Sequence, residues 1–405
     1  MQHTSSGTEP PRGIAVLLAA LGAIGPFAID TYLPSFQDIG QSLGATPLQV
    51  QQTLTAYLVP FSFMALWHGA ISDAVGRRLV ILVSQLLFAL ASFGCIFATA
   101  IEHIWILRAV QGICAGAGIV VSRAIVRDLF EGPGAQRLMS HITMMFAFAP
   151  AIAPVIGGRL QAWFGWRSVF VFLTVATLIL LVTSWRLLPE TLPREKRQSL
   201  HPGYLGRAYW KVLTSPVFLL ACAGLTFNFS GFFLYVMSAP EFLMHHLGVA
   251  ETGFLWLFGP GMLGMMLGSW VSGRLAGKLS PERTIWRGFA ILGVAALTNV
   301  AVSFWLPAGL PWSILPIPIY TFGMSLVAPS LTLMALEPFP DQRGLAASCQ
   351  MFFQSGSNAL IAGLLAPLLW GSTLTMALGM TGLAAGAMLA VWLHHRFARQ
   401  SLDLG

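Results

Sequence analysis

Long apolar segments alternate with short polar gaps along almost the whole chain. Each apolar segment is long enough to cross a bilayer, because about 20 helical residues span its hydrocarbon core. The segments fall near residues 13–36, 48–72, 79–99, 103–127, 139–160 and 166–188, and then near 215–240, 252–276, 284–306, 311–336, 344–370 and 373–395. This pattern predicts an all-α integral membrane protein with about twelve transmembrane helices.

One polar stretch divides these segments into two groups of six. It runs from Leu188 to Lys211, is rich in proline and basic residues, and is the longest polar segment of the chain. We therefore predict two six-helix halves, residues 1–188 and 212–405, joined by a linker over residues 189–211. Short sequences recur at equivalent places in the halves, as expected for a parallel-repeat transporter that binds substrate between them.

Composition excludes several classes of protein. Of the 405 residues, 56% are hydrophobic and 9% are charged, whereas soluble domains carry about 25% charged residues. The net charge is +7, but no basic patch interleaved with aromatic residues suggests a nucleic acid partner. The four cysteines lie within apolar segments without the spacing of a metal site. We expect no metal, no cofactor and no enzymatic activity.

Basic residues indicate how the chain lies in the membrane. With the N-terminus in the cytoplasm, all but three of the 22 lysines and arginines fall on the cytoplasmic side. The exceptions are Arg108 within a span and Arg159 and Arg167 at the other side. Because cytoplasmic loops are enriched in these residues, we predict that both termini are cytoplasmic and that the first segment is an uncleaved helix.

Several motifs resemble those of a known transporter family. They are Gly69-Ala-Ile-Ser-Asp73-Ala-Val-Gly76-Arg77-Arg78 after the second span, Arg108-Ala-Val-Gln111-Gly112 in the fourth, and Pro150-Ala-Ile-Ala-Pro154-Val-Ile-Gly157-Gly158 in the fifth. The first resembles the loop signature of the major facilitator superfamily, the second the RxxQG motif of its proton-driven members, and the third its antiporter motif. Asp30-Thr-Tyr-Leu-Pro34, Arg123–Phe130 and Pro189-Glu-Thr-Leu-Pro193 are similar to the Bcr/CflA branch of drug:proton antiporters.

The resemblance implies a major-facilitator-type fold, a place in the bacterial inner membrane and a monomer. In the loop motif, it implies that Arg77 pairs with Asp128 at the end of the fourth span. It also implies that Asp73 faces the positive N-terminus of the eleventh span. Small residues allow close helix contacts in membranes, and we expect this at Gly69. Ala74, Leu79 and Ala153 depart from the family pattern, and the first two weaken the carry-over of the loop's charge network.

Asp30 is the only acid that we place within the body of a span. It lies about 25 Å along the first span, and Arg108 lies about 7 Å into the fourth from the opposite direction, so the two should share a depth. Ionisable residues inside membranes are costly and often functional. We predict that Asp30 carries the proton and that Arg108 tunes its protonation. A fixed structural ion pair, or a hydrated Asp30 at the span end, remains an alternative.

Substrate contacts are expected from polar and aromatic side chains in the spans. The candidates are Tyr57, Met145, Phe146, Asn228, Phe232, Tyr235 and Gln354. An apolar wall with few hydrogen-bonding groups suits drug-like molecules. The leading prediction is proton-coupled efflux of small, largely apolar compounds by alternating access, with the substrate, protons and lipid bilayer as partners. Transport of one metabolite, such as an amino acid or nucleoside, is an alternative; a non-transporting receptor or enzyme is a remote one.

Overall fold

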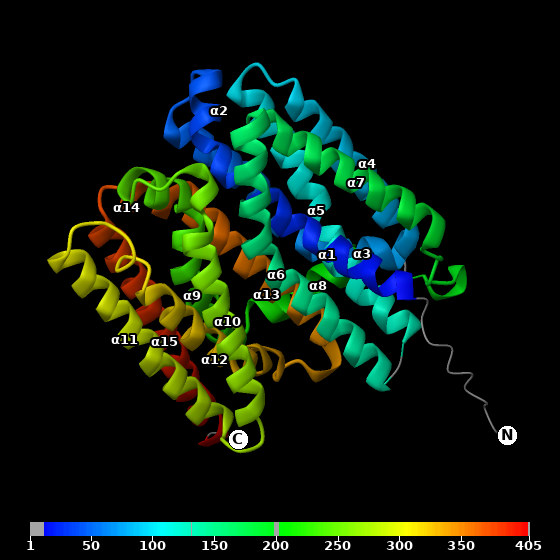
Figure 1. The fold of residues 1–405 in the computed structure, drawn as a ribbon. Coiled ribbons are helices and arrows are strands. Elements are labelled where there is room, and N and C mark those ends of the chain that lie inside the picture. The colour runs from blue at the N-terminus through cyan, green and yellow to red at the C-terminus, as the bar shows by residue number, and fades with distance from the viewer. Residues whose placement is uncertain (1–11, 131, 198–201, 404–405) are drawn as a thin grey trace.

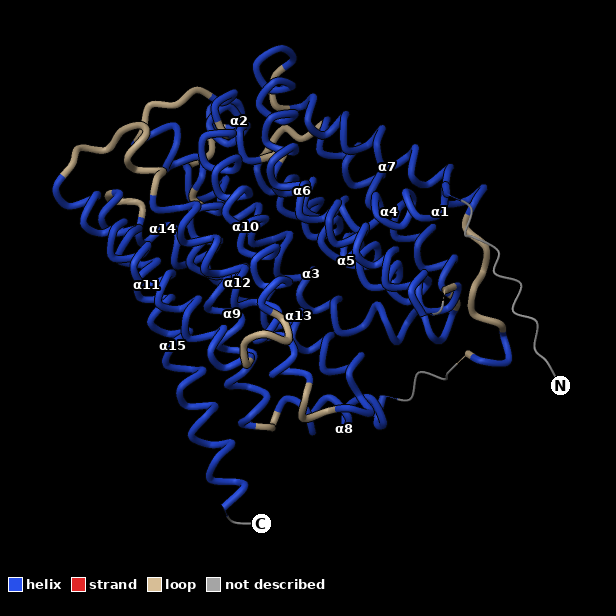
Figure 2. The backbone as a smooth tube through the Cα atoms, turned by 60° about the horizontal axis from the view of Figure 1, so that its bottom comes forward, coloured by secondary structure: helices blue, strands red, loops and turns tan. Residues whose placement is uncertain are grey.

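The computed structural model describes residues 12–130, 132–197 and 202–403. This part of the chain is built from helices (Figure 2), and eleven of its helical segments are long and apolar enough to cross a membrane. A twelfth long helix, α6 (Gly132–Phe164), packs among them. The fold class expected from the sequence, an all-α membrane protein with about twelve spans, is confirmed.

The N-terminal half contains six long helices, shown in blue to green in Figure 1. Besides α6, they are α1 (Arg12–Asp30), α3 (Pro47–Val75), α4 (Arg77–Ile96), α5 (Ile101–Leu129) and α7 (Arg167–Leu187), with a short α2 (Phe36–Leu43) between α1 and α3. Helix α5 packs against α3 and α4, and α1 packs against α5 and α6. The chemistry expected in α1 and α5 is therefore inside one bundle.

The C-terminal half also consists of long helices, two of whose connections or spans contain π-helical segments. Its long elements are α9 (Pro216–Met237), α10 (Leu255–Leu275), α11 (Pro281–Trp305), α12 (Pro316–Leu336) and α15 (Thr373–Asp403). The eleventh span consists of α13 (Arg343–Leu360), a π-helical segment η6 (Ile361–Leu365) and α14 (Ala366–Leu369). A second π-helix, η3 (Pro240–His246), and a short 3-10 turn, η4 (Glu251–Gly253), connect α9 to α10.

Local sequence explains several helix starts. Helices α3, α9 and α11 each begin with proline, which lacks the N–H group that a first turn leaves unpaired. Thr46, Ser215 and Ser280 precede these prolines, and each side chain accepts a hydrogen bond from a backbone N–H in the first turn. A threonine or serine followed by proline thus marks the start of three of the long helices.

Several boundaries differ from the sequence prediction; for example, the fifth span was expected over 139–160, whereas α6 covers Gly132–Phe164. The tenth span was expected from residue 311, but α12 begins at Pro316 after a loop. Residues 189–211 were expected to form only a linker, yet this region contains helix α8 (Pro202–Leu213). Helix α8 is amphipathic, with Val212 fully buried and Trp210 70% exposed. Because this short helix is rich in polar residues, its sequence resembles that of a loop.

The halves meet along two pairs of helices, α3 with α13 and α6 with α10. The start of α1, the end of α15 and helix α8 lie toward one end of the bundle, which we call the basic end because α4 begins there with Arg77 and Arg78 (Figures 1 and 2). Helix α2 and segments η3 and η4 lie at the other end, called the opposite end. Large apolar side chains such as Phe164 and Leu368 are exposed on the outside, which suits a bilayer solvent.

Candidate functional site

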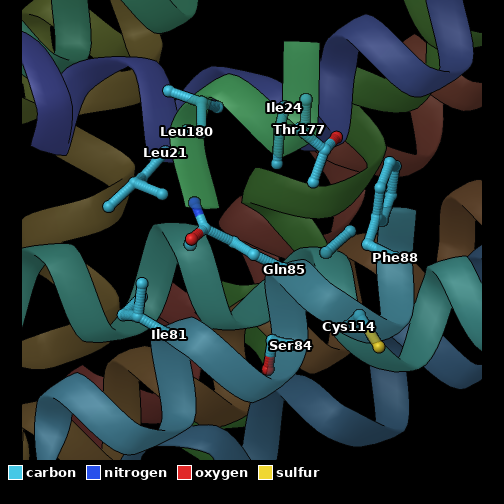
Figure 3. Close-up of a pocket in the computed structure, with 11 residues that line it drawn as sticks. Leu21, Ile24, Ile81, Ser84, Gln85, Phe88, Cys114, Thr177 and Leu180 are labelled. Atoms are coloured by element: carbon cyan, nitrogen blue, oxygen red, sulfur yellow. The ribbon is translucent and has the colours of Figure 1, made fainter. Parts of the chain in front are cut away.

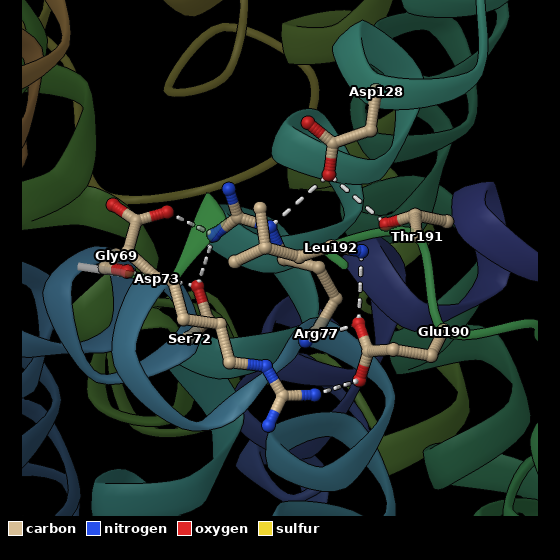
Figure 4. Close-up of polar contacts among 9 residues, drawn as sticks. Gly69, Ser72, Asp73, Arg77, Asp128, Glu190, Thr191 and Leu192 are labelled. Carbon is tan, nitrogen blue, oxygen red and sulfur yellow. Dashed lines mark hydrogen bonds and ion pairs between the residues drawn. The ribbon is translucent and has the colours of Figure 1, made fainter. Parts of the chain in front are cut away.

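The loop motif forms a cluster of charged side chains at the basic end (Figure 4). Arg77 is the first residue of α4, and Gly76 before it has φ +109°, a conformation that favours glycine. The guanidinium of Arg77 contacts Asp73 at 2.6 Å and Asp128 at 3.2 Å, and it donates to Ser72 at 2.6 Å. The contact between Arg77 and Asp128 that the resemblance implied is present. We call these residues, with Glu190 and Thr191 below, the charged latch.

Glu190 and Thr191 belong to the latch but were not among the predicted site residues. The carboxylate of Glu190 accepts a hydrogen bond from the backbone N–H of Arg77 at 3.0 Å, and the Thr191 hydroxyl donates to Asp128 at 2.9 Å. Glu190 also faces Arg197 at 3.6 Å. The Pro189–Pro193 motif was the available signal, but nothing local in it reveals a partner more than sixty residues away in the chain.

The close helix contact expected at Gly69 does not match the structure. A methyl group at Gly69 would meet only Val120, at an ordinary 3.8 Å, so no close helix contact depends on this glycine. Asp73, which the resemblance places opposite the start of α13, makes no ion pair or hydrogen bond with that helix among the described residues. Instead, it turns to Arg77 in its own half. Arg78 donates to the Trp185 carbonyl at 2.5 Å and so ties α4 to α7.

Asp30 and Arg108 are buried in the N-terminal half and lie near each other, as their predicted shared depth implies. Asp30 ends α1 and is 4% exposed, and Arg108 of α5 is fully buried. Arg108 donates to the carbonyl of Ala28, two residues before Asp30, at 2.9 Å. Among the described residues, however, no acid lies within ion-pair distance of Arg108. The two side chains are neighbours in depth but not a direct ion pair.

Aromatic rings replace the expected carboxylate around Arg108. The guanidinium lies 4.7 Å from the ring centre of Tyr32 and 4.5 Å from that of Tyr57, which stabilises a buried cation through the ring faces. Gln111 of the RxxQG motif accepts a further bond at 3.0 Å. Nε and Nη2 of Arg108 have no hydrogen-bond partner among the described residues. The site thus has unused donors beside a buried acid.

The antiporter motif lies where α6 contacts α1 of its own half and η4 of the C-terminal half. A side chain at Gly157 would collide with the carbonyl of Thr31, the residue after Asp30. A side chain at Gly158 would collide with the carbonyl of Glu251 in the C-terminal half. Pro154 is buried beside them, and Pro150 is half-buried one turn earlier. Adjacent glycines therefore bring the end of α1 and the other half against the same turn of α6.

Several predicted substrate residues are engaged in packing. Tyr57 donates to the Gly25 carbonyl at 3.1 Å, Asn228 donates to the Met324 carbonyl at 3.0 Å, and Tyr235 accepts from Asn299 at 2.7 Å. Phe232 is buried, and Gln354 is half-buried. The side chains of Met145 and Phe146 lie outside the described ones.

Two glutamines that the sequence analysis did not select join the halves at the opposite end. Gln51 of α3 donates to the carbonyls of Met237 and Ala362, both at 3.1 Å, and Gln52 donates to that of Gly363 at 3.0 Å. Ala362 and Gly363 lie in the π-helix η6, whose bonding pattern departs from that of an α-helix. We call these bonds the glutamine lock. The only feature of the sequence that pointed to the glutamine lock was the run of polar residues at the start of this span.

The described pockets differ in size and place. One between α1, α4, α5 and α7 (Figure 3) encloses about 20 Å³ beside Gln85 and Thr177, far too little for a drug-sized molecule. Another lies between the halves at the opposite end and encloses about 560 Å³. Its lining includes Gln37 and Gln51 from the N-terminal half and Glu241 and Trp370 from the C-terminal half. Its size falls within the usual range of ligand sites.

Comparison with known proteins agrees with this architecture. The model of the Major Facilitator Superfamily matches residues 17–362. The chain is 32% identical to "Uncharacterized MFS-type transporter YdgK" of Bacillus subtilis, over 96% of this chain and 94% of that protein. It is 27% identical to "Bicyclomycin resistance protein homolog" of Haemophilus influenzae, covering 93% and 94%. The crystal structure of a D-xylose-proton symporter superposes with TM-score 0.74 at 14% identity, covering 94% and 96%.

Proposed function

This chain belongs to the Major Facilitator Superfamily, and on that premise we propose that it exports small, largely apolar compounds in exchange for protons. Support for efflux comes from the relative named for bicyclomycin resistance, which matches almost the full length. The observation that carries the proton proposal is Asp30, a carboxyl group 4% exposed inside a membrane-spanning bundle. A buried carboxyl group without an ion-pair partner takes up or releases a proton when its surroundings change.

Asp30 lies where proton binding can influence the other half. Gly157 holds the end of α1 next to Asp30, and Gly158 holds the segment η4 of the C-terminal half. A change of charge at Asp30 would alter the packing of α1 on α6 and so the contact between halves. The cation of Arg108, one helix away and bonded to the carbonyl of Ala28 two residues before Asp30, is the group that we propose tunes this proton exchange. Alternating access follows if residues 1–188 and 212–405 move as two bodies.

We place the protein in the bacterial inner membrane as a monomer with both termini cytoplasmic. The basic end would then face the cytoplasm and the glutamine lock the periplasm. A cysteine introduced at Lys196 tests this orientation, since it should react with a membrane-impermeant thiol reagent only after cells are opened. The four native cysteines are buried, so background labelling is expected to be low. Labelling of intact cells would reverse the topology.

Transport is tested in an efflux-deficient bacterium that expresses the chain. Ethidium accumulation and a susceptibility panel of bicyclomycin and more apolar antibiotics are measured. We expect lower accumulation and raised resistance to at least one compound, both abolished by Asp30→Asn. Glu102→Gln is the matched control, because Glu102 is an exposed acid on α5. If the wild-type chain changes neither accumulation nor any susceptibility, drug efflux is excluded.

Proton coupling needs a separate measurement on purified protein. Adding a transported compound should release protons from the wild-type protein and from Glu102→Gln, but not from Asp30→Asn. The amide keeps the size of the carboxyl group while removing its titration. Undiminished proton release by Asp30→Asn protein would remove Asp30 from the mechanism.

A further inference from the structure

Glu241, His245 and His246 converge on the π-helix η3 at the opposite end. Each offers one metal-ligating atom, and these atoms all lie within 4.8 Å of one another. The wider turn of a π-helix explains the grouping, because residues four and five positions after Glu241 share its side. The backbone bond from Leu247 N–H to the Phe242 carbonyl, 3.1 Å, has this five-residue spacing.

The hydrogen bonds of this group suit metal binding. Nε2 of His246 lies 2.8 Å from the Trp370 carbonyl, and since a carbonyl only accepts, Nε2 carries the proton and Nδ1 keeps a free lone pair. Metal-ligating histidines usually donate their second N–H to such a carbonyl, which fixes the ring. Nδ1 of His245 lies 2.9 Å from Oε1 of Glu241. The acid and both rings are therefore positioned before any metal arrives.

We infer that Glu241, His245 and His246 form a binding site for a divalent transition metal of the zinc type. Two imidazoles and one carboxylate suit Zn²⁺ and its neighbours, whereas Mg²⁺ and Ca²⁺ prefer oxygen ligands. Zn²⁺ bonds of about 2.0–2.2 Å set tetrahedral ligand atoms roughly 3.5 Å apart, so His245 Nδ1 would release its proton and move away from Glu241, now at 2.9 Å, and any atom pair near the 4.8 Å limit would move closer. The His245 side chain is 73% exposed and free to make this shift.

The location makes the metal site accessible from the pocket between the halves. Glu241 and His245 line the pocket of about 560 Å³ between the halves. A metal with three protein ligands keeps one position for water or another group. The fourth ligand would thus be open to the pocket, which is also lined by Gln37 and Gln41 of α2.

The test measures Zn²⁺ binding by calorimetry, and Co²⁺ binding by visible absorbance, on full-length protein purified without a histidine tag. We expect one Zn²⁺ per chain, with affinity reduced at least about 100-fold in His245→Ala, His246→Ala and Glu241→Gln. Two controls should bind as the wild type does. His103→Ala removes another exposed histidine, and the double change His394→Ala with His395→Ala removes another adjacent pair.

The expected spectrum is that of four-coordinate Co²⁺, which absorbs visible light more strongly than the hydrated ion. This absorbance should be absent in the three site variants. Gel filtration and thermal unfolding of the variants check that they are folded. Absence of Zn²⁺ binding to wild-type protein below millimolar concentration overturns the site. Binding that survives in folded site variants, or disappears in either control, overturns it equally. None of these outcomes depends on transport, so the proposal stands or falls separately from drug efflux.

Discussion

At the opposite end, α3 is bonded directly to the C-terminal half, whereas the charged latch at the basic end keeps its ion pairs within the N-terminal half. The glutamine lock consists of three hydrogen bonds from Gln51 and Gln52 to backbone carbonyls. The latch joins Arg77 to Asp73 and Asp128, both from the same half. The glutamine bonds thus join the two halves, while the ion pairs of the latch stabilise the shape of one half.

The two sets of bonds also differ in how much water reaches them, and therefore in how strongly they stabilise the structure. Gln51 is 1% exposed, so water competes little for its bonds. The Asp73 side chain is 38% exposed, and such an ion pair contributes little to stability in water. We therefore expect changes at the opposite end to shift the arrangement of the halves more than changes of charge at the basic end.

One contact links α8 to this picture at the basic end. Tyr209 of α8 donates to the Leu66 carbonyl of α3 at 2.6 Å, while α8 also packs on α13. Burial, with smaller effects of Cys349 and Asp73, raises the pKa of Tyr209 to about 12. The hydroxyl therefore keeps its proton at neutral pH, and this bond does not vary with pH in the physiological range.

The largest effect is expected at the contact of α6 with both halves. Gly157→Leu or Gly158→Leu should reduce ethidium efflux to background, because each side chain would meet a backbone carbonyl that cannot move aside. Gly382→Leu is the control, since a methyl group there meets nothing within 4 Å. Membrane content of each variant is measured by immunoblot. Normal efflux by either α6 variant would show that this contact is not required in transport.

Removing the glutamine lock should come next. Three hydrogen bonds contribute about 2–4 kcal/mol in total, so Gln51→Ala with Gln52→Ala should favour opening at this end by at least about tenfold. A cysteine at Thr55, which lies beside Gly363 across the interface, reports opening through its rate of reaction with an external thiol reagent. Gln37→Ala with Gln41→Ala on α2 is the matched control. Equal rates in all three proteins would contradict the lock.

Changes in the charged latch should have an intermediate effect. Arg77→Ala removes contacts to Asp73, Asp128 and Ser72 and should lower the efflux rate by about tenfold, consistent with a loss of roughly 1–2 kcal/mol. Arg78→Ala removes one bond, to the Trp185 carbonyl, and should lower it by no more than about threefold. The two rates are compared at equal membrane content. A larger loss in Arg78→Ala would place the important contact outside the latch.

The smallest effect is expected at the glycines of the loop motif and its second copy. Gly69→Ala should transport at close to the wild-type rate, because its methyl group meets Val120 at 3.8 Å. Gly273→Ala should do the same, since nothing lies within 4 Å of its methyl group. A strong loss in Gly69→Ala alone would reveal another conformation in which α3 and α5 approach more closely.

Sequence by itself determined the class, the spans and the depth of the central charges. Apolar segments of membrane length leave few alternatives, because the bilayer requires each backbone to satisfy its hydrogen bonds as a helix. Rise per residue along a helix was enough to place Asp30 near Arg108, whereas the pairing of Arg77 with Asp128 was anticipated only from the family resemblance of the loop motif. The first of these depends on spacing, which is written along the chain.

Tertiary structure alone decided which partners those residues take. Arg108 bonds a carbonyl and two tyrosine rings rather than Asp30, and Gln51 reaches carbonyls about 190 and 310 residues further along the chain. Glycine has no side chain to mark its neighbour, so Gly69 and Gly157 look alike in sequence although only Gly157 touches a backbone. Such contacts arise from how helices distant in sequence pack, and a pattern along one helix carries no record of the surface facing it.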